Sequence, residues 1–111
     1  MDIHQVTYIE SFYSQFLAQI RFAKINFGQS NKIATEIFLT EWLMTQKKKK
    51  TFGETCRHEI SYMLIELEIN DISNLERKIL NMKENCMMIK IEMESERRML
   101  DVNSSLMRVG S

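Results

Sequence analysis

The sequence predicts an all-α fold, a helical bundle rich in coiled-coil contacts. None of its 111 residues is proline, the residue that most strongly interrupts helices, and only three are glycine. Apolar residues recur at alternating intervals of three and four positions along two long stretches. We therefore expect one helical domain over residues 1–111, with two N-terminal helices near 3–27 and 32–46 and one long C-terminal helix near 54–107.

The first helix carries an uninterrupted apolar seam with three-four spacing: Val6, Ile9, Tyr13, Phe16, Ile20, Ala23 and Phe27. Phe12, Leu17 and other apolar residues lie off this seam, so the helix is apolar over much of its circumference and should be surrounded by neighbours. Gly28 suits the position after the helix, because glycine adopts a left-handed conformation without a Cβ penalty.

The second helix is preceded by Ser30 and Asn31, either of which can cap its N-terminus. Its apolar residues are Ile33, Ile37, Phe38, Leu39, Trp42, Leu43 and Met44. A run of four lysines, Lys47–Lys50, then opens a linker that we place at 47–53, because four adjacent ammonium groups resist burial.

The third helix is expected to begin at a capping box formed by Thr51–Glu54. Its seam comprises Ile72, Leu75, Ile79, Met82, Cys86, Ile89 and Met93, with Leu100 and Met107 in frame. Upstream, Ile60, Leu64 and Leu67 follow the same kind of spacing one residue out of register. The chain therefore changes register near residue 70.

This slip coincides with the poor helix formers of Asn70–Asn74, where Ser73–Glu76 could form a second capping box. A break at this point would close the chain into a compact four-helix bundle. A continuous helix would instead give a rod of about 80 Å. Because the slip contains no glycine or proline, we expect a helix that is continuous or mildly kinked.

Composition and motifs argue against an enzyme. The 15 basic and 15 acidic residues cancel, so no net charge attracts nucleic acid, an anionic membrane or acidic substrates. The sequence has no glycine-rich phosphate loop, nucleophile elbow or Glu-x-x-His pair, and Cys56 and His58 lack the remaining ligands of a metal site. We expect no catalytic residue, metal or cofactor.

The sequence also bears on where the protein acts. The N-terminus lacks the basic segment of a signal peptide, and polar residues interrupt every apolar stretch too early for a membrane span. Two cysteines do not make the dense disulfide framework of a small secreted domain. We expect an intracellular protein, cytoplasmic or nuclear, without a signal peptide or a transmembrane segment.

Two features indicate a protein partner. Eight of the ten aromatic residues lie within the first 42 positions, and a short chain of helices offers them limited cover. Leu80, Met87 and Ile91 form a second apolar strip away from the seam of the last helix, and a helix with two apolar faces contacts two neighbours. We expect this strip, together with Phe12 and Leu17, to bind a partner.

These expectations give a small coiled-coil scaffold or assembly subunit, which acts as an oligomer or in an obligate complex with a helical partner. The first alternative is a small helical chaperone or inhibitor, of the secretion-system or phage type, that masks a helix of its partner. The second is nucleic-acid association through Lys47, Lys48, Lys49 and Lys50. Convergence of Arg21, Lys24 and Lys32 on this run would favour it.

Overall fold

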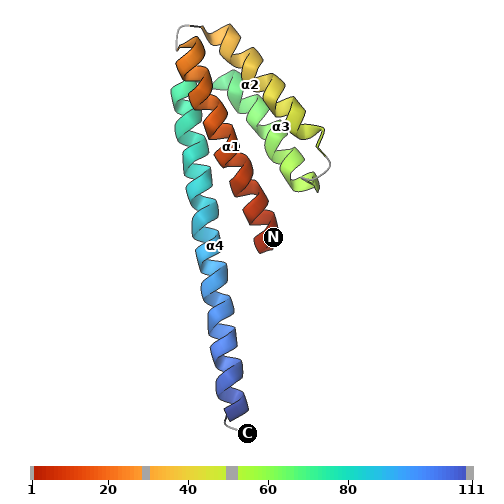
Figure 1. Cartoon of the computed structure of the whole chain (residues 1–111), viewed down its shortest axis with the longest axis vertical. Coiled ribbons are helices and arrows are strands. Elements are labelled where there is room, and N and C mark those ends of the chain that lie inside the picture. Colours follow the sequence, from red (N-terminus) through yellow and green to blue (C-terminus); the bar gives the residue numbers. More distant parts are fainter. Residues whose placement is uncertain (1, 29–30, 50–52, 110–111) are drawn as a thin grey trace.

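The computed structural model describes residues 2–28, 31–49 and 53–109, with side chains for all of these except 53–56, 108 and 109. The described chain forms four α-helices and no strand: α1 (Ile3–Phe27), α2 (Lys32–Lys47), α3 (Gly53–Ile69) and α4 (Ile72–Val109). Each helix runs antiparallel to the one before it, and α4 continues well past the others (Figure 1). The predicted all-α helical bundle is confirmed.

The connection between α1 and α2 follows the sequence signals. Gly28 has a positive φ of 69°, and its N–H donates to the carbonyl oxygen of Lys24 at 3.1 Å. Of the two expected caps for α2, Asn31 serves: its side-chain oxygen accepts the N–H of Ala34 at 3.2 Å. These two residues turn the chain back on itself.

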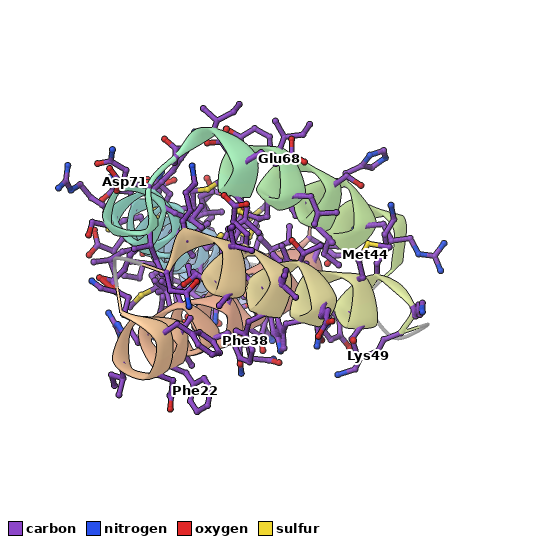
Figure 2. The ribbon with its side chains drawn as sticks, turned by 90° about the horizontal axis from the view of Figure 1, so that it is seen from above. Phe22, Phe38, Met44, Lys49, Glu68 and Asp71 are labelled. Atoms are coloured by element: carbon purple, nitrogen blue, oxygen red, sulfur yellow. The ribbon has the colours of Figure 1, made fainter. Side chains whose placement is uncertain are left out.

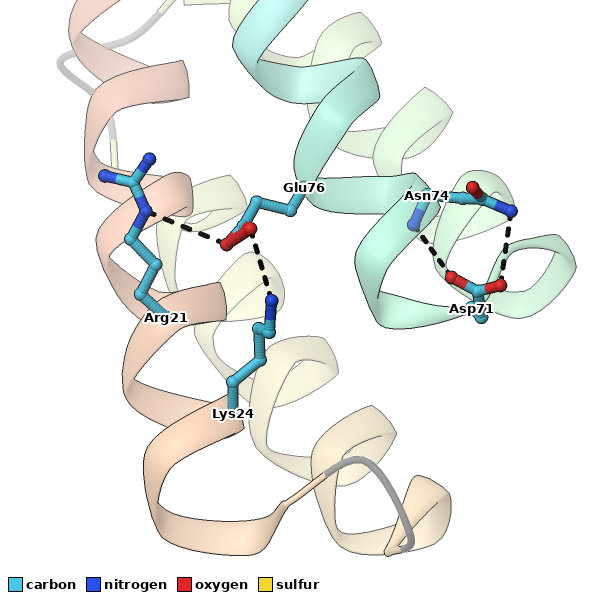
Figure 3. A network of polar contacts seen from close by, with 5 residues as sticks. All are labelled: Arg21, Lys24, Asp71, Asn74 and Glu76. Carbon is cyan, nitrogen blue, oxygen red and sulfur yellow. Dashed lines mark hydrogen bonds and ion pairs between the residues drawn. The ribbon is translucent and has the colours of Figure 1, made fainter.

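The stretch predicted as one long helix is two helices, so the expectation of continuity is wrong. Asp71 lies between α3 and α4, where its carboxylate accepts the N–H of Asn74 at 2.8 Å (Figure 3). At the end of α3, the side chain of Asn70 donates to the carbonyl oxygen of Glu66 at 3.1 Å. Such side-chain bonds compete with helical backbone bonds and end a helix without glycine or proline. The cap is Asp71, in place of the expected Ser73–Glu76 box. The side chains of the expected Thr51–Glu54 box lie outside the described part of the chain.

The core lies where α1 is enclosed by α4 on one side and by the α2–α3 hairpin on the other, and α1 packs most extensively against α4. Its fully buried large side chains come from all four helices: Val6, Phe12, Phe16, Leu17, Ile20, Leu39, Leu43, Ile60, Met63, Leu75 and Ile79. The predicted α4 seam continues through the buried Cys86 and the half-buried Met93. Ile89 departs from it, since 41% of its surface is exposed.

A stack of aromatic rings joins α1 to α2. The ring of Trp42 lies 5.9 Å from that of Phe12 and 5.6 Å from that of Phe16, both in near-parallel orientation. Further along the same interface, Phe22 stacks on Phe38 at 5.3 Å (Figure 2). Offset aromatic pairs add to the free energy gained by area burial alone. One chain therefore covers most of its own N-terminal aromatic surface.

A polar cluster holds α3 against α4 close to their connection. The ammonium of Lys78 lies 2.7 Å from a carboxylate oxygen of Glu66, which also accepts the side-chain N–H of Asn70 at 2.6 Å. The same ammonium lies 5.3 Å from the ring centre of Tyr62. The hydrogen bond from Lys78 lowers the pKa of Glu66, although burial acts in the opposite direction.

The depressed pKa of Glu66 makes part of the stability depend on pH. A carboxyl whose pKa is lower in the folded state stabilises the protein above its ordinary pKa, and this contribution is lost as the pH falls through the folded value. We expect the free energy of unfolding to decline below about pH 4, and to decline less steeply in Glu66→Gln. Urea denaturation at several pH values measures this. Glu41→Gln, at an exposed carboxylate on α2, is the control, and equal acid sensitivity of Glu66→Gln and the wild type would contradict the assignment.

Candidate protein-interaction surface

The C-terminal half of α4 projects from the bundle (Figure 1). The molecule measures 68 × 26 × 20 Å, and its radius of gyration is 18.5 Å, whereas a compact domain of 100 residues has about 13 Å. All side chains from Asp101 to Met107 are exposed. The end of α4 therefore has no cover from the rest of its own chain.

This projecting half is rich in apolar side chains. Between 41% and 77% of the surface is exposed for Ile91, Met99, Leu100, Val102, Leu106 and Met107 in this half, and for Met87, Met88 and Ile89 just before it. Large exposed apolar surfaces mark sites of protein interaction, and methionine adapts well to varied partners. The end of α4 is the candidate interaction surface of the described chain.

The exposed residues occupy two faces of α4. At 3.6 residues per turn, Leu100 and Met107 continue the seam that faces α1 higher up. Five other exposed residues lie on the nearly opposite face: Met88, Ile91, Met99, Val102 and Leu106. We call the first four of them the outer strip. Two apolar faces give this helix the capacity to contact two neighbours.

Of the second apolar strip predicted from the sequence, Leu80, Met87 and Ile91, one residue lies in the core and two lie at the surface. Leu80 is half-buried and packs against the core cluster, so it belongs to the bundle. Met87 and Ile91 are exposed and line a shallow cavity of about 260 Å³ beside α1. Lys90 crosses this cavity, with its ammonium 2.9 Å from a carboxylate oxygen of Glu10. Met87 and Ile91 remain available to a partner.

Phe12 and Leu17, the other two predicted partner-binding residues, lie in the core. Only 1% and 2% of their surfaces are exposed. The prediction that they need a second chain is wrong, because α1 is covered by three helices of its own chain once the break at Asp71 allows α3 and α4 to fold back. Tyr8 and Phe22 remain about half exposed.

The sequence reasoning missed most of the outer strip. Met88, Met99 and Val102 do not fit the seam of α4, and their spacing has meaning only once the face covered by α1 is known. A signal was nevertheless present, because Met99, Val102 and Leu106 keep the three-four spacing of a second coiled-coil face.

The lysine run begins at the end of α2 that leads into α3. Lys47 is the last residue of α2 and is half-buried, whereas Lys48 and Lys49 are exposed (Figure 2). Lys50 and the linker as far as residue 52 lie outside the described residues. The expected linker begins one residue later than predicted.

The three basic side chains whose convergence was the test do not gather at this run. Arg21 and Lys24 both contact the carboxylate of Glu76, at 3.7 and 3.3 Å (Figure 3). Lys32 pairs with Glu36 at 3.6 Å, and it lies at the opposite end of α2 from the lysine run, about 22 Å away along the helix. The convergence that would have favoured nucleic-acid binding is therefore missing.

The described cysteine is not set up as a nucleophile. Cys86 is buried in the seam of α4, and burial raises the pKa of its thiol, with the carboxylates of Glu10 and Glu59 adding to the effect. Its thiol therefore stays protonated and packs as a small apolar group. The side chain of Cys56 lies outside the described residues.

Neither a metal cluster nor a membrane-spanning helix is found among the described residues. No three His, Cys, Asp or Glu side chains among them gather closely enough to hold a metal ion. None of the described helices combines the length and the apolar character that crossing a membrane requires. No protein-family model, curated protein sequence or solved structure matches the chain significantly.

Proposed function

We propose that this protein is a non-enzymatic protein–protein interaction module, a small coiled-coil scaffold or assembly subunit that works as an oligomer or in an obligate complex. The bundle formed by α1, α2, α3 and the first half of α4 is the folded base. The projecting half of α4 is the element that binds another helix. Its exposed apolar faces supply the contact surface.

The apolar seam of α4 supports this proposal most directly, because it continues along the helix beyond the part that the other three helices cover. Leu75 and Ile79 are fully buried against the bundle, whereas Leu100 and Met107, in the same frame, are 66% and 77% exposed. A solvent-exposed helix that contacts no other chain usually carries polar residues at such positions. An apolar seam without cover is what a helix needs to pair with a partner.

The chaperone alternative finds less support. A cavity of about 280 Å³ lies at the closed end of the bundle, lined by Thr35, Leu67, Asn70 and other residues. A helix with its side chains is about 10 Å wide, and one turn of it rises 5.4 Å, so a cavity of this volume accommodates little more than one turn. The projecting helix is the larger interaction surface.

Truncation after Arg98 tests the proposal. The variant lacks Met99, Leu106 and the rest of the projecting end, whose side chains from Asp101 to Met107 contribute no cover to the bundle. We expect its melting temperature to stay within a few degrees of the wild type. We also expect it to lose the association that the full chain shows in solution or with a stoichiometric partner from native extract. Analytical ultracentrifugation and affinity capture measure the two.

A point variant shows whether truncation acts by removing the apolar surface of α4 or only by shortening the helix. Leu106→Asp in the full chain should weaken association as truncation does, whereas Ser105→Asp adds the same charge in the same turn and should have little effect. If the truncated chain and the full chain have the same mass and capture the same partners, the end of α4 is not the interaction surface and the proposal fails.

A further inference from the structure

We infer that the outer strip of α4 binds the same strip on a second copy of this chain, in an antiparallel pair whose twofold axis passes at Ser95. This inference rests on the proposed function and names its partner. The pair is formed by exposed residues of α4 alone and leaves the bundle of each copy intact.

The spacing of the outer strip is symmetric about Ser95. Ile91 and Met99 lie four residues before and after it, and Met88 and Val102 lie seven residues before and after it. Leu106 lies beyond this symmetric set, eleven residues after Ser95, and would be level with Glu84 of the other copy. A twofold interface requires that if one residue contacts another across it, the reverse contact also exists. Antiparallel pairing at Ser95 meets this requirement: Met88 of one copy faces Val102 of the other, and Ile91 faces Met99.

The centre of the strip suits close packing. Ser95 is exposed and lies on the same face as the four apolar residues. The distance between packed helices depends on the side chains at their contact, and a small residue lets them approach to the lower end of the usual 8–10 Å. Close approach at Ser95 brings the longer side chains of Ile91 and Met99 into contact on either side.

The strip is free in a single chain, and pairing does not make the two bundles collide. Met88, Ile91, Met99 and Val102 are each between 57% and 66% exposed. At 3.6 residues per turn, they lie on the face of α4 opposite the seam that packs against α1. In an antiparallel pair the two bundles lie toward opposite ends of the joined helices.

Charges beside the strip give this pairing a recognisable pattern. Glu94 and Arg98 are exposed and lie 3.9 Å apart in one chain. Antiparallel pairing at Ser95 brings Arg98 of each copy level with Glu94 of the other, within about two residues along the axis. On the opposite flank, Glu92 of each copy approaches Glu96 of the other. One flank attracts and the other repels.

The expected interface is small. A fully buried aliphatic side chain removes about 60–120 Å² from water, so eight side chains that are each a little over half exposed remove on the order of 400 Å². Flanking side chains add to this, but the total stays below the roughly 1,200 Å² of stable complexes. The pair is therefore reversible and forms at high protein concentration.

Sedimentation equilibrium of the full chain between about 10 and 500 μM tests the pairing, since weak complexes dissociate in this range. We expect the wild type to change from monomer to dimer. Met99→Asp should weaken dimerisation at least tenfold. Glu92→Lys should strengthen it several-fold, because it turns two repulsive contacts with Glu96 into attractive ones. Misfolding does not produce a gain of association, so this variant is informative even if Met99→Asp proves unstable.

Crosslinking tests the orientation, with a short thiol-reactive reagent in a Cys56→Ser, Cys86→Ala background whose helix content is checked first. Ser95→Cys should crosslink to itself. Met88→Cys should not, because two copies of that position are about 21 Å apart along the antiparallel axis. A mixture of Met88→Cys with Val102→Cys should crosslink.

Two results would overturn the inference. Self-crosslinking of Met88→Cys would show a parallel pair, and a monomer at every concentration would show that a second copy is not the occupant. In the second case, loss of a foreign partner on truncation after Arg98 would still support the proposed function. If truncation changes nothing either, both the inference and the proposed function fail.

Discussion

Ile79→Asp is expected to unfold the protein at room temperature. Ile79 has no exposed surface and lies in the core on α4. Truncating a buried isoleucine costs about 2–5 kcal/mol, and burying an unpaired carboxylate adds several kcal/mol more. Domains of this size have a total stability of about 5–15 kcal/mol, so the combined loss removes most or all of it. Circular dichroism at 222 nm with a thermal melt measures the result.

Ile89→Asp is the matched control on the same helix. The spacing of the α4 seam predicts that Ile79 and Ile89 are equivalent, but Ile89 is 41% exposed. Aspartate at this position keeps contact with water, so the chain should fold and lose only about 1 kcal/mol. Equal unfolding of the two variants would mean that α4 is rotated about its axis relative to this structure.

Phe16→Ala is expected to lower the free energy of unfolding by about 3–5 kcal/mol. Phe16 has no exposed surface, and its ring stacks on those of Phe12 and Trp42 between α1 and α2. Its removal leaves a cavity and ends two ring contacts. Urea denaturation followed by the fluorescence of Trp42 measures both the stability and the packing of the stack.

Phe22→Ala provides the comparison for the ring stack. Phe22 also stacks on a neighbouring ring, that of Phe38, but half of its surface is exposed. We expect a loss of about 1 kcal/mol, since water already reaches much of the ring. If Phe16→Ala and Phe22→Ala cost the same, the Phe12–Phe16–Trp42 stack does not form the centre of the core.

Local sequence signals predicted the helices better than they predicted the fold. The bounds of α1 were predicted correctly, and those of α2 to within one residue, because Gly28 and Asn31 act through bonds to residues three or four positions away. The break at Asp71 was harder, since the same polar residues are tolerated within exposed helices. Two residues, Asp71 and Ser73, could cap α4, and the sequence does not show which one does. The break is also stabilised by the packing of α4 against α1, which no local signal reveals.

The candidate interaction surface could be predicted only in part, for a geometric reason. Exposed methionines in the last helix were visible from the sequence, and Met87 and Ile91 were identified correctly as exposed residues off the seam. Whether an apolar residue is buried depends on where its neighbours end. The residues next to Leu100 in the sequence do not show that α1 ends beside it and leaves 66% of its surface exposed.

The packing of α1 against α4 also has a consequence for how the protein is made. Among the described helices, α1 is made first and its main neighbour, α4, is made last; the contact between Glu10 and Lys90 joins the two. At about 5–20 residues per second, translation takes several seconds to proceed from the end of α1 through the start of α4. Throughout this time the nascent chain carries Phe16 and Ile20 without their final cover. The bundle therefore cannot close until α4 has left the ribosome, and a chain interrupted before α4 keeps this apolar surface exposed.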